Sequence, residues 1–218
     1  MTDLFPAHVE TERLRLERAD RALDPDSVYE KMGAHRERAV AEHEHLHSNP
    51  HQHPKGSADW LADAREQWEA GEAATWAIFA REDEPAPDAA VVPDDDQLHV
   101  GRASLHVEWG KRQAFTGVTI HRPFWGRGYS GERAGATLAV AFDRLDLDYV
   151  SPAHMVDNEQ SKRAIRKYVD RWGGQRDCLL RNWEPTEDGE PADLVRYTIS
   201  QQQWRAAGGT PDEVTIRA

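Results

Sequence analysis

Apolar residues recur along the chain with two spacings, and each spacing predicts one kind of element. Short runs in which apolar and polar residues alternate predict strands, at 11–16, 75–81, 98–107, 115–121, 149–156, 176–184 and 193–200. Longer runs with apolar residues three or four positions apart predict helices, at 25–47, 57–68, 134–145 and 158–172, with Ser57 as the cap of the second. The order is β-α-α-β-β-β-α-β-α-β-β, an antiparallel meander that leads into one β-α-β crossover.

Three places interrupt this pattern, and each predicts a local feature. The phase of alternation reverses at Gly101-Arg102, which indicates a β-bulge. Pro152 lacks an N–H group, so we expect one side of its strand to be unpaired there. Residues 82–95 are acidic and rich in proline, which is typical of a solvated loop between strands.

The length of 218 residues suits a single domain. We expect residues 1–205 to form it, because the strand series resumes directly after each loop and no repeat is visible. The chain from about residue 205 has no clear period, so residues 206–218 are expected to be a frayed C-terminal tail.

Charge changes the picture of the surface. The formal net charge is -12, and only five of the 27 basic residues are lysine. An acidic surface poor in lysine favours solubility in concentrated salt, which indicates a halophilic cytoplasm, although a GC-rich genome explains the same composition. The negative sign argues against a general nucleic-acid or anionic-membrane binder. No long apolar run is visible, and the single cysteine excludes an intrachain disulfide, so we expect a cytoplasmic protein.

The segment RPFWGRGYSGE, residues 122–132, lies between a predicted strand and a predicted helix. Its core, GRGYSG, formally matches the G-x-G-x-x-G dinucleotide fingerprint. A doubly wound sheet needs several parallel strands, and the chain offers only one crossover, so that reading is disfavoured. Glycines before a helix also form an anion site, since unpaired N–H groups and the helix dipole converge there. A simple turn from strand to helix is the remaining explanation.

Four segments together resemble the GCN5-related N-acetyltransferases (GNAT), in particular the RimJ/RimL-like branch. Residues 11–16, TERLRL, are similar to the opening T-E-R-L-x-L of that branch, and residues 125–130, WGRGYS, to its pyrophosphate loop W-G-K-G-Y-A. Asn158 and Ser161 match N-x-x-S, and Lys167 follows at a position where that family often has lysine. Two departures are a longer helix end, through Trp172, and Ser130-Gly131 in place of Ala-Thr.

The resemblance implies an α/β fold with a mixed central sheet of about seven strands, a splayed middle and four flanking helices. It also implies acetyl-CoA as co-substrate and direct transfer of the acetyl group to a primary amine, without a metal. The loop backbone would cradle the pyrophosphate, the strand before it would pair with the pantetheine, and the next helix would bind the pantetheine arm. The implied coenzyme-binding residues are Val118, Thr119, Ile120, Trp125, Gly126, Arg127, Gly128, Tyr129, Ser130, Gly131, Asn158 and Lys167.

The reaction needs a base for the ammonium group and an acid for the leaving thiolate. Glu108, at the end of a central strand, is the leading candidate for the base, with His106, Glu132 or a chain of water molecules as rivals. Ser161 could protonate the thiolate, and it could equally be an ordinary serine in the first turn of a helix.

A histidine-rich tract at 43–53 allows a different function. His43, Glu44 and His47 fit the H-E-x-x-H pattern of zinc peptidases. Pro50 replaces the glycine that turns the chain towards a third ligand in the extended pattern, and a biased tract produces such matches by chance. We expect the tract to line the acceptor pocket and to tune its response to pH.

The predicted function is therefore an acetyl-CoA-dependent N-acetyltransferase. Its acceptor is a protein N-terminal α-amine or a small-molecule amine, and a homodimer is allowed. Two alternatives stay open, the zinc peptidase and an acyl-CoA-binding module that has lost turnover.

Overall fold

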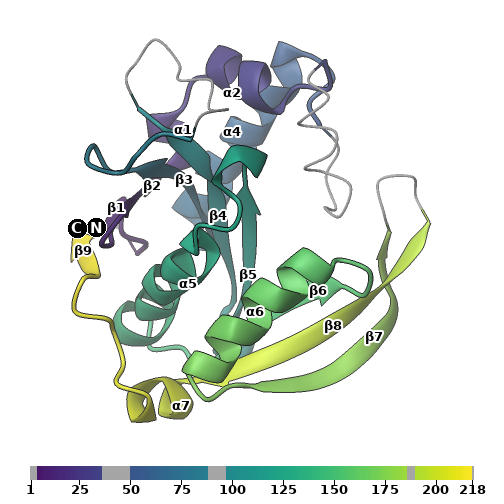
Figure 1. The fold of residues 1–218 in the computed structure, drawn as a ribbon. Coiled ribbons are helices and arrows are strands. Elements are labelled where there is room, and N and C mark those ends of the chain that lie inside the picture. The colour runs from purple at the N-terminus through teal and green to yellow at the C-terminus, as the bar shows by residue number, and fades with distance from the viewer. Residues whose placement is uncertain (1–3, 36–49, 88–96, 186–189, 218) are drawn as a thin grey trace.

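The computed structural model describes residues 4–35, 50–87, 97–185 and 190–217. It contains one nine-stranded sheet in the order β7-β8-β6-β5-β4-β3-β2-β1-β9 (Figure 1). All neighbouring strands are antiparallel except β5 and β6, which are parallel and joined through α5. The sequence predicted a mixed sheet of about seven strands with one crossover, and the two additional strands lie at one edge.

The elements of the fold have the following bounds. The strands are β1 His8–Glu10, β2 Leu14–Arg18, β3 Ala73–Ala80, β4 His99–Glu108, β5 Gln113–Ile120, β6 Tyr149–Met155, β7 Gln175–Pro185, β8 Pro191–Ser200 and β9 Thr215–Arg217. The α-helices are α1 Ala19–Ala22, α2 Pro25–Met32, α4 Pro54–Ala70, α5 Tyr129–Ala139, α6 Glu159–Arg171 and α7 Gln201–Ala206. Short helical turns lie at η1 Trp109–Lys111, η2 Arg122–Phe124 and η3 Val140–Arg144.

The parallel pair in the middle of the sheet separates along its length. β5 pairs with β6 only from Gln113, opposite Tyr149, to Thr116, opposite Pro152. In the described part of the chain, residues 117–120 have a strand partner on the β4 side alone. The sheet is therefore split beyond Thr116, which agrees with the splayed middle expected from the sequence.

Pro152 interrupts the other side of β6 as well. β6 pairs with β8 at Val150, opposite Ile199, and again at Ala153, opposite Arg196. Among the described residues no pair joins Pro152 to β8, as the missing N–H group predicts.

The predicted bulge in β4 is present, one residue earlier than expected. Ile78 pairs with Gly101 whereas Phe79 pairs with His99, so Val100 is the extra residue. A Cβ atom at Gly101 would lie 2.0 Å from the Thr119 carbonyl oxygen, so only glycine fits this close approach of β4 to β5.

The two ends of the chain differ from the prediction. Residues 11–16 are not one strand, because the Thr11 hydroxyl oxygen accepts the Leu14 N–H at 3.0 Å and closes a turn between β1 and β2. The expectation of a frayed C-terminus is wrong, because β9 pairs with β1 and Ile216 lies opposite Val9. A three-residue strand carries too little alternation to be visible in a sequence.

The helices before β3 also begin and end differently. The predicted helix 25–47 is wrong as a single element, because α2 ends at Met32 and Gly33 forms a bridge with His51. Residues 36–49 lie outside the described residues. α4 begins at Pro54 with His53 as its cap, since the His53 ring accepts the Gly56 N–H at 3.1 Å, and Ser57 is buried inside the helix.

Helices α5 and α6 lie side by side in front of the sheet, whereas α1, α2 and α4 gather near its other end (Figure 1). α5 is buried almost all round, which its small residues permit. α6 buries only the stripe of Ile165, Tyr168 and Val169 against the sheet. No described helix is both long and apolar enough to cross a membrane.

Substitution of Trp204 can test whether α7 is an integral part of the domain. It is fully buried, with ring centroids 5.8 Å from Phe142 and 5.2 Å from Trp172. Trp204→Ala should lower the free energy of unfolding by about 3–5 kcal/mol, because it opens a large cavity. Denaturant unfolding measures this, with the exposed Trp183→Ala as a control that changes stability by less than about 0.5 kcal/mol. Equal effects of the two substitutions would contradict the packing described here.

Candidate active site

The segment between β5 and α5 presents a row of backbone N–H groups. Gly126 and Gly128 have φ values of +80° and +83°, and α5 begins at the next residue, Tyr129. In the described structure no protein acceptor takes the N–H groups of residues 126–130, whereas the Gly131 N–H donates to the Gly128 carbonyl at 3.1 Å. Unpaired N–H groups at the start of a helix attract an anion.

The space in front of this segment is open. A Cβ atom added at Gly126 or Gly131 would meet nothing within 4 Å. Positive φ values at Gly126 and Gly128 are also costly for other residues. A phosphate group can therefore reach the backbone at this turn, because the glycines have no side chains to block it.

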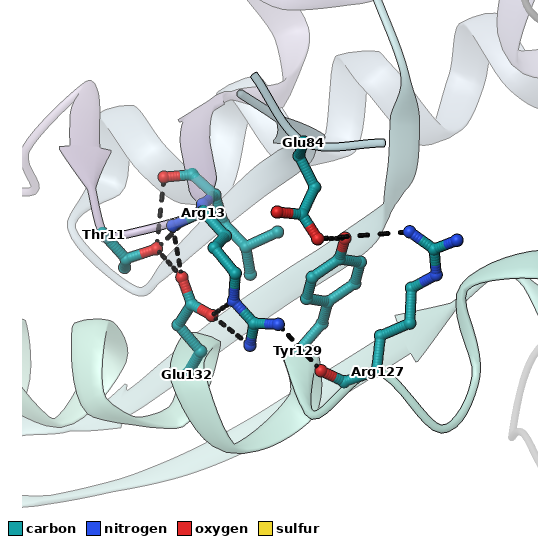
Figure 2. Close-up of polar contacts among 7 residues, drawn as sticks. Thr11, Arg13, Glu84, Arg127, Tyr129 and Glu132 are labelled. Atoms are coloured by element: carbon teal, nitrogen blue, oxygen red, sulfur yellow. Dashed lines mark hydrogen bonds and ion pairs between the residues drawn. The ribbon is translucent and has the colours of Figure 1, made fainter. Parts of the chain in front are cut away.

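Glu132, in the first turn of α5, ties this helix to the turn between β1 and β2 (Figure 2). Its carboxylate accepts the Thr11 hydroxyl at 2.5 Å and the Arg13 backbone N–H at 2.7 Å, and it pairs with the Arg13 guanidinium at 2.7 Å. Arg13 also donates to the Arg127 carbonyl at 3.0 Å. Burial opposes the charge on Arg13, but the bonds to Glu132 outweigh it and raise the pKa of Arg13. We call Thr11, Arg13 and Glu132 the clamp.

A second set of contacts holds the other side of the turn (Figure 2). The buried Tyr129 donates its hydroxyl to Glu84 at 2.5 Å, and the Arg127 guanidinium lies 4.0 Å from the same carboxylate. Arg127 also donates to the Pro85 carbonyl at 2.6 Å. Burial and the bond to Glu84 raise the pKa of Tyr129. Arg127 was predicted among the coenzyme-binding residues, and in this structure its side chain faces the segment after β3. Tyr129 can serve a ligand through its backbone N–H, because its ring is buried.

Trp125 fixes the beginning of the turn to the end of β5. Its indole N–H donates to the Ile120 carbonyl at 2.5 Å, and the Arg122 guanidinium lies 5.9 Å from its ring centroid. The ring is 38% exposed. It is therefore partly accessible beside the turn, and its contact with the coenzyme stays a prediction.

The separated part of β5 leads directly into this turn. Val118 and Ile120 are partly buried, and Thr119 is buried with its hydroxyl oxygen 3.3 Å from the Arg102 Nε donor. Because β6 has diverged, these residues offer backbone groups on one side to a strand-like ligand.

Asn158 and Ser161 lie together at the beginning of α6. The Asn158 side-chain oxygen accepts the Ser161 N–H at 2.9 Å and caps the helix. This leaves the Asn158 amide N–H groups and the Ser161 hydroxyl for other partners. Lys167 is exposed on α6, away from the inner stripe, and its contact with the coenzyme stays a prediction.

The candidate bases are not gathered at the turn. Glu108 is at the hairpin end of β4, opposite Gln113, whereas Gly101, opposite Ile120, is at the end next to the turn. Its carboxylate accepts hydrogen bonds from Gln113 and from Lys111 at 2.9 Å, and these bonds lower its pKa. Its role as the base stays a prediction, which its bonds to Gln113 and Lys111 disfavour. The rival Glu132 is engaged in the clamp, and the exposed His106 lies between the two ends of β4.

Only part of the histidine tract can be placed. His43, Glu44 and His47 lie outside the described residues. His51 lies 2.7 Å from the Ser57 hydroxyl through its Nδ1, and His53 caps α4. Within the described ranges no group of three metal-binding side chains occurs.

Comparison with protein families identifies the chain. A family model described as "Acetyltransferase (GNAT) domain" matches residues 13–168, which is more than half of the sequence. The chain belongs to the GNAT acetyltransferase family. The matched range of this GNAT protein begins within the clamp and ends in α6, so it includes the turn, the separated strand and Asn158.

Solved structures agree with the GNAT fold. RimJ from Mycobacterium smegmatis in complex with CoA-disulfide has a TM-score of 0.68, 14% identity and full coverage of both chains. A GCN5-related N-acetyltransferase from Brucella melitensis has a TM-score of 0.70 and 16% identity, covering 95% of this chain and 87% of its own. A Vibrio cholerae protein provisionally named a ribosomal-protein-serine acetyltransferase has a TM-score of 0.66 and 19% identity, covering 92% and 99%. No curated protein matches.

The family assignment makes the protein an acetyl-CoA-dependent N-acetyltransferase, and the zinc-peptidase alternative gains no support. The described residues fit the coenzyme, since unpaired N–H groups meet an open space at the turn. The sequence did not predict that the three clamp residues contact one another. The available signal was the T-E-R-L segment together with the acid that follows the glycines.

Glu132→Gln should weaken acetyl-CoA binding about tenfold, because the loss of charge loosens α5 from the β1–β2 turn that positions the loop. Calorimetric titration of the purified protein measures the dissociation constant. Asp59→Asn is the matched control, since it removes an equal charge from the exposed pair with Lys55. An unchanged dissociation constant in Glu132→Gln would exclude the clamp from coenzyme binding.

Glu108→Gln should leave the rate within about twofold and the shape of the pH–rate profile unchanged. The lowered pKa of Glu108 keeps the carboxylate ionised from pH 6 upward, so it cannot produce a rate change between pH 7 and 9. Initial rates at saturating acetyl-CoA measure this. A loss of more than tenfold, with disappearance of the acidic limb, would restore Glu108 as the base.

Proposed function

We propose that this GNAT protein acetylates the α-amine of protein N-termini. The observation that carries the coenzyme half of this proposal is the row of unpaired N–H groups at residues 126–130, next to the unpaired side of β5. The pyrophosphate would bind these N–H groups, and the pantetheine would pair with the unpaired side of β5. The reactive thioester would then lie near Thr116, where β5 and β6 meet.

The proposed reaction has one bond-forming and one bond-breaking step. The amine nitrogen attacks the thioester carbonyl, and the C–S bond then breaks with its electron pair leaving on sulfur. A base takes the proton from nitrogen, and an acid or a nearby positive charge stabilises the thiolate. Ser161, with its hydroxyl at the beginning of α6, is retained as a proposed acid.

The choice of a protein N-terminus rests on the solved structures named above. One is RimJ, and another is provisionally named for acetylation of a ribosomal-protein serine. A small-molecule amine is the other candidate acceptor, and the test below separates the two. The histidine tract is proposed to line the acceptor side, with histidines that respond to pH.

The surroundings in which the protein works are part of the proposal. The formal net charge of -12 and the shortage of lysine support a salt-rich cytoplasm. We propose no nucleic-acid partner, and a homodimer as the state to be tested by light scattering. Activity should rise or hold between 0.5 M and 3 M KCl.

An acceptor screen should detect thiol release from acetyl-CoA with peptides that have a free N-terminus and not with N-acetylated copies. Acetyl-CoA should first raise the melting temperature, because it binds only the folded state. No stabilisation by CoA or acetyl-CoA would contradict the coenzyme site. Stabilisation without thiol release from any amine would indicate a binding module, and release with polyamines alone would replace the proposed acceptor.

A further inference from the structure

The β-bulge in β4 decides the direction of the His99 side chain. Ile78 and Phe79 are adjacent in β3, so they point to opposite faces of the sheet. Their partners, Gly101 and His99, are two residues apart, and regular alternation would place both on one face. The extra residue, Val100, brings His99 to the face of Phe79, where the two ring centroids lie 5.4 Å apart. Without the bulge this histidine would point to the other face.

On this face His99 meets His121, the residue directly after β5. The His121 Nε2 lies 3.2 Å from the His99 Nδ1, and the ring centroids are 5.0 Å apart. Both residues are buried, with 7% and 4% of their surface exposed. At this distance one nitrogen donates its hydrogen to the lone pair of the other, so the contact requires one nitrogen with a hydrogen and one without. We call these two residues the histidine pair.

The histidine pair joins the end of β5 to the bulge, next to a backbone bond. The His121 N–H donates to the Val100 carbonyl at 2.8 Å, and the Phe124 N–H donates to the His121 carbonyl at 2.9 Å. Phe124 is buried, with its ring centroid 6.3 Å from that of Tyr129 at the beginning of α5. His121 is therefore the point at which β5 leads into the glycine turn at residues 126–131. A displacement of His121 would move both the open edge of β5 and this turn.

His99 is poorly suited to carry a proton. Its Nε2 is buried and forms no hydrogen bond of normal geometry with a described residue. Burial lowers the pKa of His99 well below its ordinary value, His121 and the charge of Lys31 on α2 lower it further, and the Gly101 backbone opposes this only in part. A proton on His99 would therefore be a buried charge, and protons on both histidines would set two N–H groups against each other.

The other charged groups on the elements around the pair have partners of their own. On β2, Glu17 forms an ion pair with Arg15. The Arg102 guanidinium on β4 and the Arg122 guanidinium in η2 each lie over an indole ring. Among these side-chain types only histidine has an ordinary pKa between pH 5 and 8. The histidine pair is therefore the part of this region expected to respond to a moderate change in pH.

We propose that the histidine pair holds the glycine turn in its coenzyme-binding position, and that a proton on the pair releases the turn. The inference rests on the proposed function, because it requires the pyrophosphate at this turn. His99 and His121 act through the backbone that leads into the turn, so both are positioning residues. As the pH falls, a released turn takes up the proton that the held turn excludes, and the population able to bind the coenzyme decreases. Affinity is therefore full above the ordinary histidine pKa of about 6.5 and declines below it.

The test measures the binding of dephospho-CoA by calorimetric titration between pH 5.5 and 7.5. This ligand lacks the 3′-phosphate, whose second ionisation, at about pH 6, would obscure the result. In the wild-type protein the dissociation constant should rise about tenfold from pH 7.5 to 5.5, which is the change that one histidine with a pKa of about 6.5 produces.

His99→Gln keeps a hydrogen-bonding partner for His121 but cannot take up a proton. At pH 7.5 it should bind dephospho-CoA within about threefold of wild type, and its dissociation constant should change less than about threefold down to pH 5.5. His99→Phe keeps a ring against Phe79 and should give an equally flat profile, which covers the case in which the glutamine variant does not fold. His8→Gln, at an exposed position in β1, is the control and should retain the full change.

A full pH dependence in His99→Gln, with a circular dichroism spectrum like that of wild type, would overturn this inference and assign the effect to other groups. A wild-type profile without pH dependence would overturn it as well. Absence of binding of both CoA and dephospho-CoA at pH 7.5 would instead contradict the coenzyme site of the proposed function.

Discussion

The ion pair between Arg13 and Glu132 joins the beginning of the sheet to the first turn of α5. A turn whose N–H groups face a ligand cannot also use them to hold itself, so its shape must be fixed from outside. The clamp does this on one side, through Glu132 and through the Arg127 carbonyl, and Glu84 does it on the other through Tyr129. The separated strand, the crossover helix and the coenzyme site all depend on the position of this turn.

The larger elements of the fold could be predicted because each repeats its pattern of apolar and polar residues over a long run. The strands 98–107 and 115–121, and the helix 158–172, have alternation or helical spacing over seven residues or more. β1 and β9 could not be predicted, because three residues show no period and each is a strand only through its neighbour. The helix predicted at 25–47 extended too far, because propensity does not reveal that Gly33 pairs with His51.

The site was predictable to the extent that it is local in sequence. The glycine turn and the Asn158–Ser161 pair are each contained within one short segment, and the structure gives positive φ values at the turn and a cap at the beginning of α6. The clamp joins residues from different elements, and nothing in their local sequence indicates the partner of each. The same limit applies to Glu108, whose position at the hairpin end depends on the register of β4 against β5.

The unpaired side of β5 has a consequence for the protein without its coenzyme. Exposed strand edges invite pairing with other chains and lead to aggregation. Here the open edge is only residues 117–120, and it lies inside the sheet with β6 beside it, not at the border. Four residues are at the short end of the range of strand lengths, so this edge offers a foreign strand only a few backbone hydrogen bonds. The fold therefore keeps a backbone site open to a short ligand while offering little to a neighbouring chain.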